Sequence, residues 1–243
     1  MTRKHIYIDP LYYQPLTKLR GGMDPQALSS VNIPGFAGIE AAQTVTDVMT
    51  VILRQVQTGD VGDALLNLVT AHALTGVDNQ MSASAELVTV CTNLLQDSAN
   101  LPILARSPQF LRMFVHNYGQ KRLDALILGL ILPQLCTYTQ MVCGKGQLSR
   151  GQHFTFQRFV ADRGVFVQFS AQLPVDEHGR PEIMVPGVLT TAVPRHTAAG
   201  FLRATGLRVA DGRDVQRRAL EVAVADSSGL RQYLGTGLTV DDL

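Results

Sequence analysis

The sequence predicts a mainly α-helical protein with an inserted β-hairpin or ribbon, an α+β fold in which a helical bundle surrounds one buried central helix. Three patterns support this fold class. The stretch 123–143 is apolar on every side, residues 38–117 repeat apolar side chains at helical spacing, and residues 153–173 alternate with period two. With 243 residues, 46% of them hydrophobic and only 17% charged, the chain is long enough to bury a sizeable core.

The stretch 123–143 is the predicted centre of the bundle. Every residue between Ala125 and Leu132 is apolar or glycine, whereas a surface helix would show a polar face. The uninterrupted apolar run is shorter than the ~20 residues that span a membrane, so we expect a buried core helix and no membrane insertion. Pro133 predicts a kink in this helix.

Residues 1–36 predict an extended N-terminal arm. Prolines and glycines interrupt any helix there, yet apolar side chains are spread through the segment and need a surface to lie on. The arm wraps either its own domain or a neighbouring subunit; a long surface loop is the alternative. The candidate oligomerisation residues are four apolar anchors of the arm and one ribbon residue: Tyr12, Tyr13, Leu16, Leu19 and Phe166.

Residues 37–143 predict the helical bundle core. Four helices are expected before the central one, at about 39–57 and 61–74, from Ser82 or Ser84 to a boundary at Pro102, and from Ser107–Pro108 to Tyr118–Gly119. Their lengths and short connections are typical of a helical bundle.

Residues 144–243 predict a β-ribbon followed by C-terminal helices, packed on the core as one unit. The expected hairpin pairs 153–157 with 165–173 through a turn at 162–164. A second ribbon is expected from 182–185 and 188–193. Helices are expected at 198–205 and 214–225, with a last helical turn near Leu230.

Charge divides the chain into unlike parts. Residues 36–100 carry seven acids and one base, a net charge of −6, whereas residues 101–218 carry fifteen bases and seven acids, a net charge of +8. Such a division favours head-to-tail self-association or a basic face for a polyanion. Solvated surface charges without a partner are the alternative.

Basic residues form two groups that suit contacts with RNA phosphates. Aromatic residues interleave the first group, and arginines with stacking aromatics hold single strands without sequence preference. The alternative places the phenylalanines in the core and the arginines in solvent. The candidate nucleic-acid-binding residues are Arg106, Arg112, Lys121, Arg122, Lys145, Arg150, Arg158, Arg213, Arg217 and Arg218; Arg203 and Arg208 belong to the second group as well.

Motifs of known chemistry are not recognisable in this sequence. Lys145 lies between two glycines, but Gln140 and Gly146 stand where a phosphate-binding loop needs glycine and a hydroxyl residue. The six histidines show no HExxH or HxH spacing, and the three cysteines show no CxxC spacing, so we expect buried free thiols and neither a metal nor a cofactor. The first residues lack the apolar core of a signal peptide, which predicts a cytoplasmic or virion location.

These observations together favour a non-enzymatic, self-assembling structural protein of the viral capsid or nucleoprotein kind. It would form homo-oligomers through the arm and the ribbon, and it would bind RNA through its arginine clusters. An enzyme of an unfamiliar family, with its site between the helical part and the ribbon, is one alternative. A protein-binding adaptor is the other.

Overall fold

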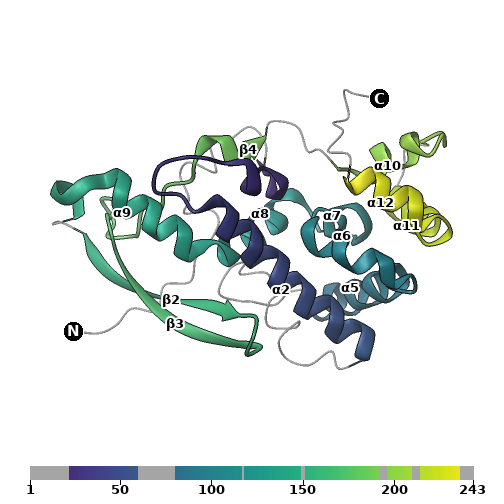
Figure 1. Cartoon of the computed structure of the whole chain (residues 1–243), viewed down its shortest axis with the longest axis horizontal. Helices are drawn as coiled ribbons and strands as arrows, with labels where there is room; N and C mark the ends of the chain where they lie inside the picture. Colours follow the sequence, from purple (N-terminus) through teal and green to yellow (C-terminus); the bar gives the residue numbers. More distant parts are fainter. Residues whose placement is uncertain are drawn as a thin grey trace.

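A computed structural model describes residues 22–59, 80–116, 118–148, 151–191, 196–209 and 214–235. Within these ranges the protein is mostly helical, with one long antiparallel β-ribbon and one very short strand pair (Figure 1). This confirms the α+β class predicted from the sequence.

Helix α2, Gly38–Thr58, confirms the first predicted helix. Its apolar side chains recur every three or four residues, which places Val45, Met49 and Ile52 on one buried face. Gly59 ends the helix with a positive φ of 72°, a left-handed conformation that glycine adopts at low cost. The second predicted helix, 61–74, lies outside the described residues.

Short helices follow between α5 and the central pair. Helix α5, Gln80–Leu94, and the 3-10 turn η3, Ser98–Asn100, precede α6, Leu101–Arg106, and α7, Phe110–Phe114. Helix α5 ends at Leu94, before the expected boundary at Pro102. Pro102 stands in the first turn of α6, where proline is tolerated because a first turn leaves that N–H unpaired. Helix α6 packs on α2.

The predicted central helix is two helices with a sharp bend. Helix α8, Gln120–Leu130, and helix α9, Leu132–Leu148, meet at 74°, because Pro133 cannot donate the backbone hydrogen bond that would continue α8. Leu126, Ile127 and Leu128 point in three directions from α8 and all are buried, so this part of the stretch is enclosed as predicted. The prediction was wrong for the second half, because Met141 and Val142 in α9 are each 47% exposed. A second break lies inside α9 at Gly144.

None of the described helices is long and apolar enough by itself to span a membrane. Only α8 and α9 taken together, over Arg122–Leu130 and Leu132–Gly144, have the length and composition of such a span.

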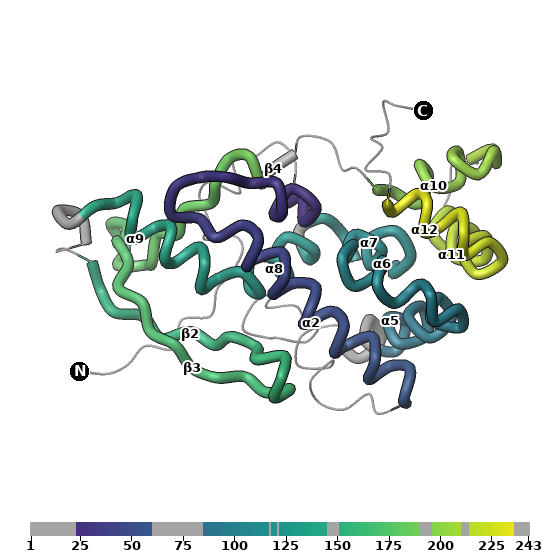
Figure 2. The backbone as a smooth tube through the Cα atoms, in the orientation of Figure 1, coloured from purple at the N-terminus to yellow at the C-terminus, as the bar shows by residue number. Residues whose placement is uncertain are grey.

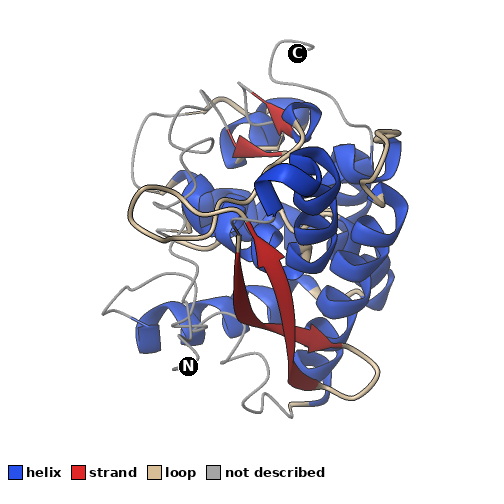
Figure 3. Ribbon diagram, turned by 90° about the vertical axis from the view of Figure 1, so that its left-hand side faces the viewer, coloured by secondary structure: helices blue, strands red, loops and turns tan. Residues whose placement is uncertain are grey.

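The predicted hairpin is confirmed as a nine-residue ribbon. Strands β2, Gln152–Val160, and β3, Val165–Leu173, pair in continuous register, and Gly164 completes the turn with a φ of 62°. At the base of the ribbon Phe154, Ala171 and Leu173 are buried toward α8 and α9. Figure 3 shows the ribbon facing the viewer with helices around it.

The predicted second ribbon, 182–185 with 188–193, does not form. Residues 187–189 make the 3-10 turn η4, and strand β4, Thr190–Thr191, pairs with strand β1, Gly22–Met23, from the other end of the chain. Pro186 lacks the N–H that a ladder position requires, which explains the turn. The short β1–β4 pair lies apart from the long ribbon in Figure 3.

Residues 22–36 correct the prediction of an extended arm over 1–36. They form β1 and the 3-10 helix η2, Pro25–Ser30, and they pack against α2 of the same chain. Met23, Leu28 and Phe36 are buried in the core, because these anchors find a surface within their own molecule. Residues 1–21, with Tyr12, Tyr13, Leu16 and Leu19, lie outside the described part of the chain.

Three short helices form the C-terminal lobe. Helices α10, Ala198–Ala204, α11, Val215–Ala225, and α12, Ser227–Gly235, pack on one another at the end of the molecule opposite the ribbon (Figure 2). The side chain of Thr197 accepts a hydrogen bond from the Gly200 N–H at 2.9 Å and caps α10. The helices predicted at 198–205 and 214–225 are thereby confirmed.

Candidate functional site

The predicted nucleic-acid-binding arginines do not gather on one surface. Arg158 lies exposed on the ribbon, whereas Arg217 and Arg218 lie exposed on α11, and Figure 1 shows these elements at opposite ends of the molecule. Arg106 is exposed at the end of α6, and Arg122 is half-buried in α8. Four candidates cannot be placed, since they or their side chains lie outside the described residues: Lys121, Lys145, Arg150 and Arg213.

The C-terminal lobe carries the denser set of exposed arginines. Arg203 ends α10, Arg208 follows it, and Arg217 and Arg218 lie in α11, which packs on α10. Arg217 forms an ion pair with Asp214 at 3.4 Å, and both side chains are largely exposed, so this pair contributes little to stability. No carboxylate of the described residues forms an ion pair with Arg203, Arg208 or Arg218.

Arg112 corrects the expectation that it faces phosphate, because its half-buried guanidinium is hydrogen-bonded within the protein. Its Nη1 donates a hydrogen bond to the Gln120 side-chain oxygen at 2.7 Å, and its Nη2 donates to the His196 carbonyl. Burial lowers the pKa of the Arg112 guanidinium, against the opposing effect of Asp124. A side chain with these partners holds α7, α8 and the start of α10 together.

Asp124 is the acidic end of the same network. Its Oδ1 accepts hydrogen bonds from the Met23 N–H at 2.8 Å and from the Gln120 side-chain amide at 2.7 Å. Burial raises the pKa of the Asp124 carboxyl, while the two hydrogen bonds and the Arg112 charge act in the opposite direction. Gln120 therefore bonds to both Asp124 and Arg112. The bond from the Met23 N–H to Asp124 ties β1 to α8. The sequence signal for this network was the acid at the start of an otherwise apolar helix.

The network continues into the C-terminal lobe. His196 is fully buried, and its Nε2 donates to the Tyr233 carbonyl at 3.2 Å. The Tyr233 hydroxyl lies 3.3 Å from both the N–H and the carbonyl of Thr197, and burial raises the pKa of Tyr233. Gln26 donates to the Leu234 carbonyl at 2.9 Å. These bonds join the first described residues of the chain to its last helix.

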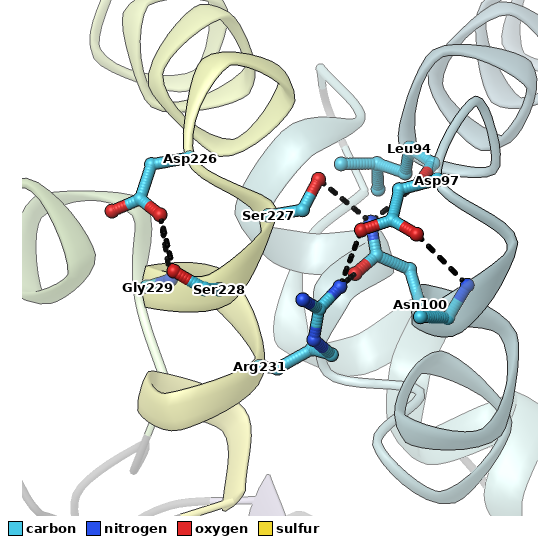
Figure 4. Close-up of polar contacts among 9 residues, drawn as sticks. Leu94, Asp97, Asn100, Asp226, Ser227, Ser228, Gly229 and Arg231 are labelled. Atoms are coloured by element: carbon cyan, nitrogen blue, oxygen red, sulfur yellow. Dashed lines mark hydrogen bonds and ion pairs between the residues drawn. The ribbon is translucent and has the colours of Figure 1, made fainter.

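A second polar cluster attaches α12 to the helical bundle (Figure 4). Arg231 points from α12 to Asp97 at 2.6 Å and to the Asn100 side-chain oxygen at 2.9 Å. Asn100 is fully buried and also donates to the Leu94 carbonyl at 2.7 Å. Arg231 is the main cause of the lowered pKa of Asp97. This cluster fastens α12, near the end of the described chain, to the turn between α5 and α6 in its middle.

The aromatic residues near the first arginine group do not form a stacking platform. They are all at most 8% exposed, so they cannot stack on bases, and the core reading of these residues is the right one: Phe110, Phe114, Tyr118, Phe154, Phe156 and Phe159. The apolar spacing that forms a helix or strand core also produces the interleaving seen in the sequence.

Phe166, the candidate oligomerisation residue on the ribbon, is half-buried. Its ring packs edge-to-face on that of Phe159, with ring centres 5.2 Å apart. Both rings lie on the ribbon face opposite Phe156, because Phe159 and Phe156 are an odd number of residues apart. Phe166 thus has a partner within its own chain.

Cys91, Cys136 and Cys143 are buried free thiols, as expected, and burial raises the pKa of Cys91 and of Cys136 to about 12. Among the described histidines, cysteines and acids, no three come together as a metal site.

Comparison with protein-family models, with curated proteins and with solved structures finds no match to this chain. Asp124, Arg112, His196 and Arg231 are engaged in bonds that hold the fold together. The exposed arginines and the ribbon are among the groups that remain accessible to other molecules.

Proposed function

We propose that this protein is a non-enzymatic structural protein that assembles with copies of itself, of the viral capsid or nucleoprotein kind. The observation that carries the proposal is the β2–β3 ribbon. Among the described residues no third strand pairs with either of its edges, although each strand is nine residues long. Proteins that remain monomeric protect such edges, because unpaired backbone groups attract other chains.

RNA binding is the second part of the proposal, and the exposed arginines support it. Arg158 on the ribbon and the four arginines of the C-terminal lobe are exposed, and they lie on two separate surfaces. An RNA strand shared between neighbouring copies would meet the ribbon of one copy and the lobe of the next. The N-terminal residues 1–21 are proposed to contact a neighbouring subunit, as the apolar anchors in their sequence favour.

Light scattering on a sizing column tests the assembly. We expect the mean mass to rise with protein concentration, and electron micrographs of the same fractions to show regular particles. An enzyme of an unfamiliar family or an adaptor would allow a monomer at every concentration. A mass of 26.4 kDa that stays constant up to high concentration contradicts the proposal.

Deletion of residues 1–21 tests the arm. The deletion stops before Gly22 because Met23, Leu28 and Phe36 belong to the core, so a longer deletion would damage the fold. We expect the shortened protein to unfold at the same urea concentration and to assemble poorly. Normal particles from the shortened protein would remove the arm from the mechanism.

Charge reversal tests RNA binding. Arg218→Glu changes an exposed arginine of the lobe, and Arg54→Glu, an exposed arginine on α2, is the matched control. We expect the first variant to bind single-stranded RNA more weakly and to lower the slope of log K against log salt by about 0.7 for each lost phosphate contact. Equal effects of the two reversals would show that net charge alone matters.

A further inference from the structure

Strand β3, Val165–Leu173, is an unusual strand edge. It contains no charged residue, no proline, no glycine and no bulge, which are the devices that discourage pairing with another chain. On the face that Leu173 shares, the side chains become more exposed from the base toward the turn: Leu173 is fully buried, Val167 is half-buried and Val165 is 46% exposed. The half of β3 near the turn is thus accessible while the base is anchored.

The backbone of β3 shows which groups point outward. The side-chain amide of Gln140 in α9 donates to the Gln172 carbonyl at 3.0 Å, and α9 is not part of the ribbon. The Gln172 carbonyl is therefore directed away from β2. Because this direction alternates along an antiparallel strand, the backbone groups of Phe166, Gln168 and Ser170 point outward as well. Gln140 occupies the last outward position, so Val165–Ala171 are left for a partner.

We propose that β3 pairs with β3 of a second copy of this chain, in an antiparallel arrangement around a two-fold axis that passes through Gln168. This inference rests on the proposed self-assembly and names its contact. Gln168 would face its own symmetry mate, Phe166 would face Ser170, and Val167 would face Phe169. The result is a four-stranded sheet across the dimer, in which the partner strands supply the outward hydrogen bonds.

Charge and side-chain character favour a second copy as the occupant of this edge. Because β3 is uncharged, no like charges meet along the pairing, and a Val167–Phe169 pair is of the aromatic and β-branched type that stabilises sheets. The antiparallel arrangement also brings the exposed Arg163 at the turn of one copy toward the loop after β3 of the other. That loop carries Glu177, whose side chain is 85% exposed.

The decisive experiment is a charge swap at the axis. Gln168 is exposed, so Gln168→Lys and Gln168→Glu leave the fold unchanged, which thermal unfolding verifies. In either variant alone, two like charges oppose each other across the axis, and we expect self-association at least about fivefold weaker than in the unchanged protein. An equimolar mixture of the two variants places Lys opposite Glu and restores association, as followed by native mass spectrometry.

Gln157→Lys is the matched control. Gln157 is exposed on the same ribbon face and pairs with Gln168 within one chain, but it lies on β2, away from the axis. We expect this control to associate like the unchanged protein.

A proline variant tests the backbone contact. Gln168→Pro removes an outward N–H without breaking the ladder to β2, and we expect more than tenfold weaker association, whereas Gln168→Ala keeps the N–H and associates normally.

The outcomes separate the two proposals. If the unchanged protein assembles and both charge variants assemble equally well, the β3 contact is wrong while self-assembly stands. If the proline variant fails to assemble but the mixture of the two charge variants does not regain association, another segment pairs with the edge of β3. The two-fold pairing is then likewise wrong. A protein that is monomeric throughout contradicts the assembly itself.

Discussion

Replacement of Asp124 by alanine tests the buried network most directly, and we expect a loss of about 3–5 kcal/mol in the free energy of unfolding. The Met23 N–H and the Gln120 amide, at 2.8 and 2.7 Å, would both lose their acceptor. A buried donor left unpaired costs about 1–3 kcal/mol. The remainder comes from Arg112, because its half-buried guanidinium would lose the favourable charge of Asp124, and Gln120, which bonds to both, would lose one of its two partners.

Asp124→Asn is the matched control because it keeps an acceptor oxygen of the same reach and removes only the charge. We expect a loss below about 1 kcal/mol, because burial disfavours the charge that this change removes, while the asparagine oxygen still accepts a hydrogen bond. Urea unfolding followed by circular dichroism at pH 7 measures both variants, and an unchanged m-value shows that the unfolded states are comparable. A loss below about 1 kcal/mol for the alanine variant, or equal losses for the two variants, would refute the role given to this network.

The pH dependence of the same pair supplies an independent check. Burial raises the pKa of Asp124 in the folded protein above its unfolded value of 3.8. The stability that protonation of this carboxyl contributes is therefore fully present below about pH 4 and is lost as the pH rises through the raised pKa. We expect the stability of the unchanged protein, relative to the Asp124→Asn variant, to fall between pH 4 and pH 7. A difference that is constant over this range would contradict the direction of the shift.

Two further substitutions test other parts of the fold. Asn100→Ala removes the buried hydrogen bonds to the Leu94 carbonyl and to Arg231, so we expect a loss of about 1–3 kcal/mol, while Ser227→Ala, whose contact to Asn100 is 3.4 Å long, serves as a control with little effect in the same urea titration. Gly144→Ala places a Cβ at φ 62° and ψ 173°, a conformation open almost only to glycine, so we expect about 1–3 kcal/mol of destabilisation although no atom lies within 4 Å. Gly235→Ala in α12 is the matched control, with space around it and no positive φ, and a loss as large as that at Gly144 would show that backbone strain is not the cause.

The predicted grouping of the nucleic-acid-binding arginines depended more on tertiary structure than the other predictions did. In the sequence Arg112 lies near exposed residues such as Arg106. In the structure its guanidinium is hydrogen-bonded to Gln120 and His196, which lie 8 and 84 residues further along the chain. The phenylalanines near these arginines are in the core, because their regular spacing is that of the buried positions of a helix or a strand. Residues that are close together in the sequence therefore have side chains that point in unrelated directions in the fold.

Local elements of this protein could be predicted from its amino-acid sequence. Helical spacing predicted α2, period two predicted the β2–β3 ribbon, Gly164 completed its turn, and Pro133 predicted the bend between α8 and α9. These features follow from the chain within a few residues, because backbone hydrogen bonds, apolar periodicity and the geometry of proline and glycine act locally.

Contacts between distant segments could not be predicted in this way and are seen only in the folded chain. The pairing of β1 with β4, the bond from Met23 to Asp124 and the fastening of Arg231 to Asn100 join residues roughly one hundred or more positions apart. No periodicity in the sequence encodes such contacts, since their stability depends on burial and on partners that folding brings together. For the same reason residues 22–36 of the predicted N-terminal arm belong to the core of their own chain.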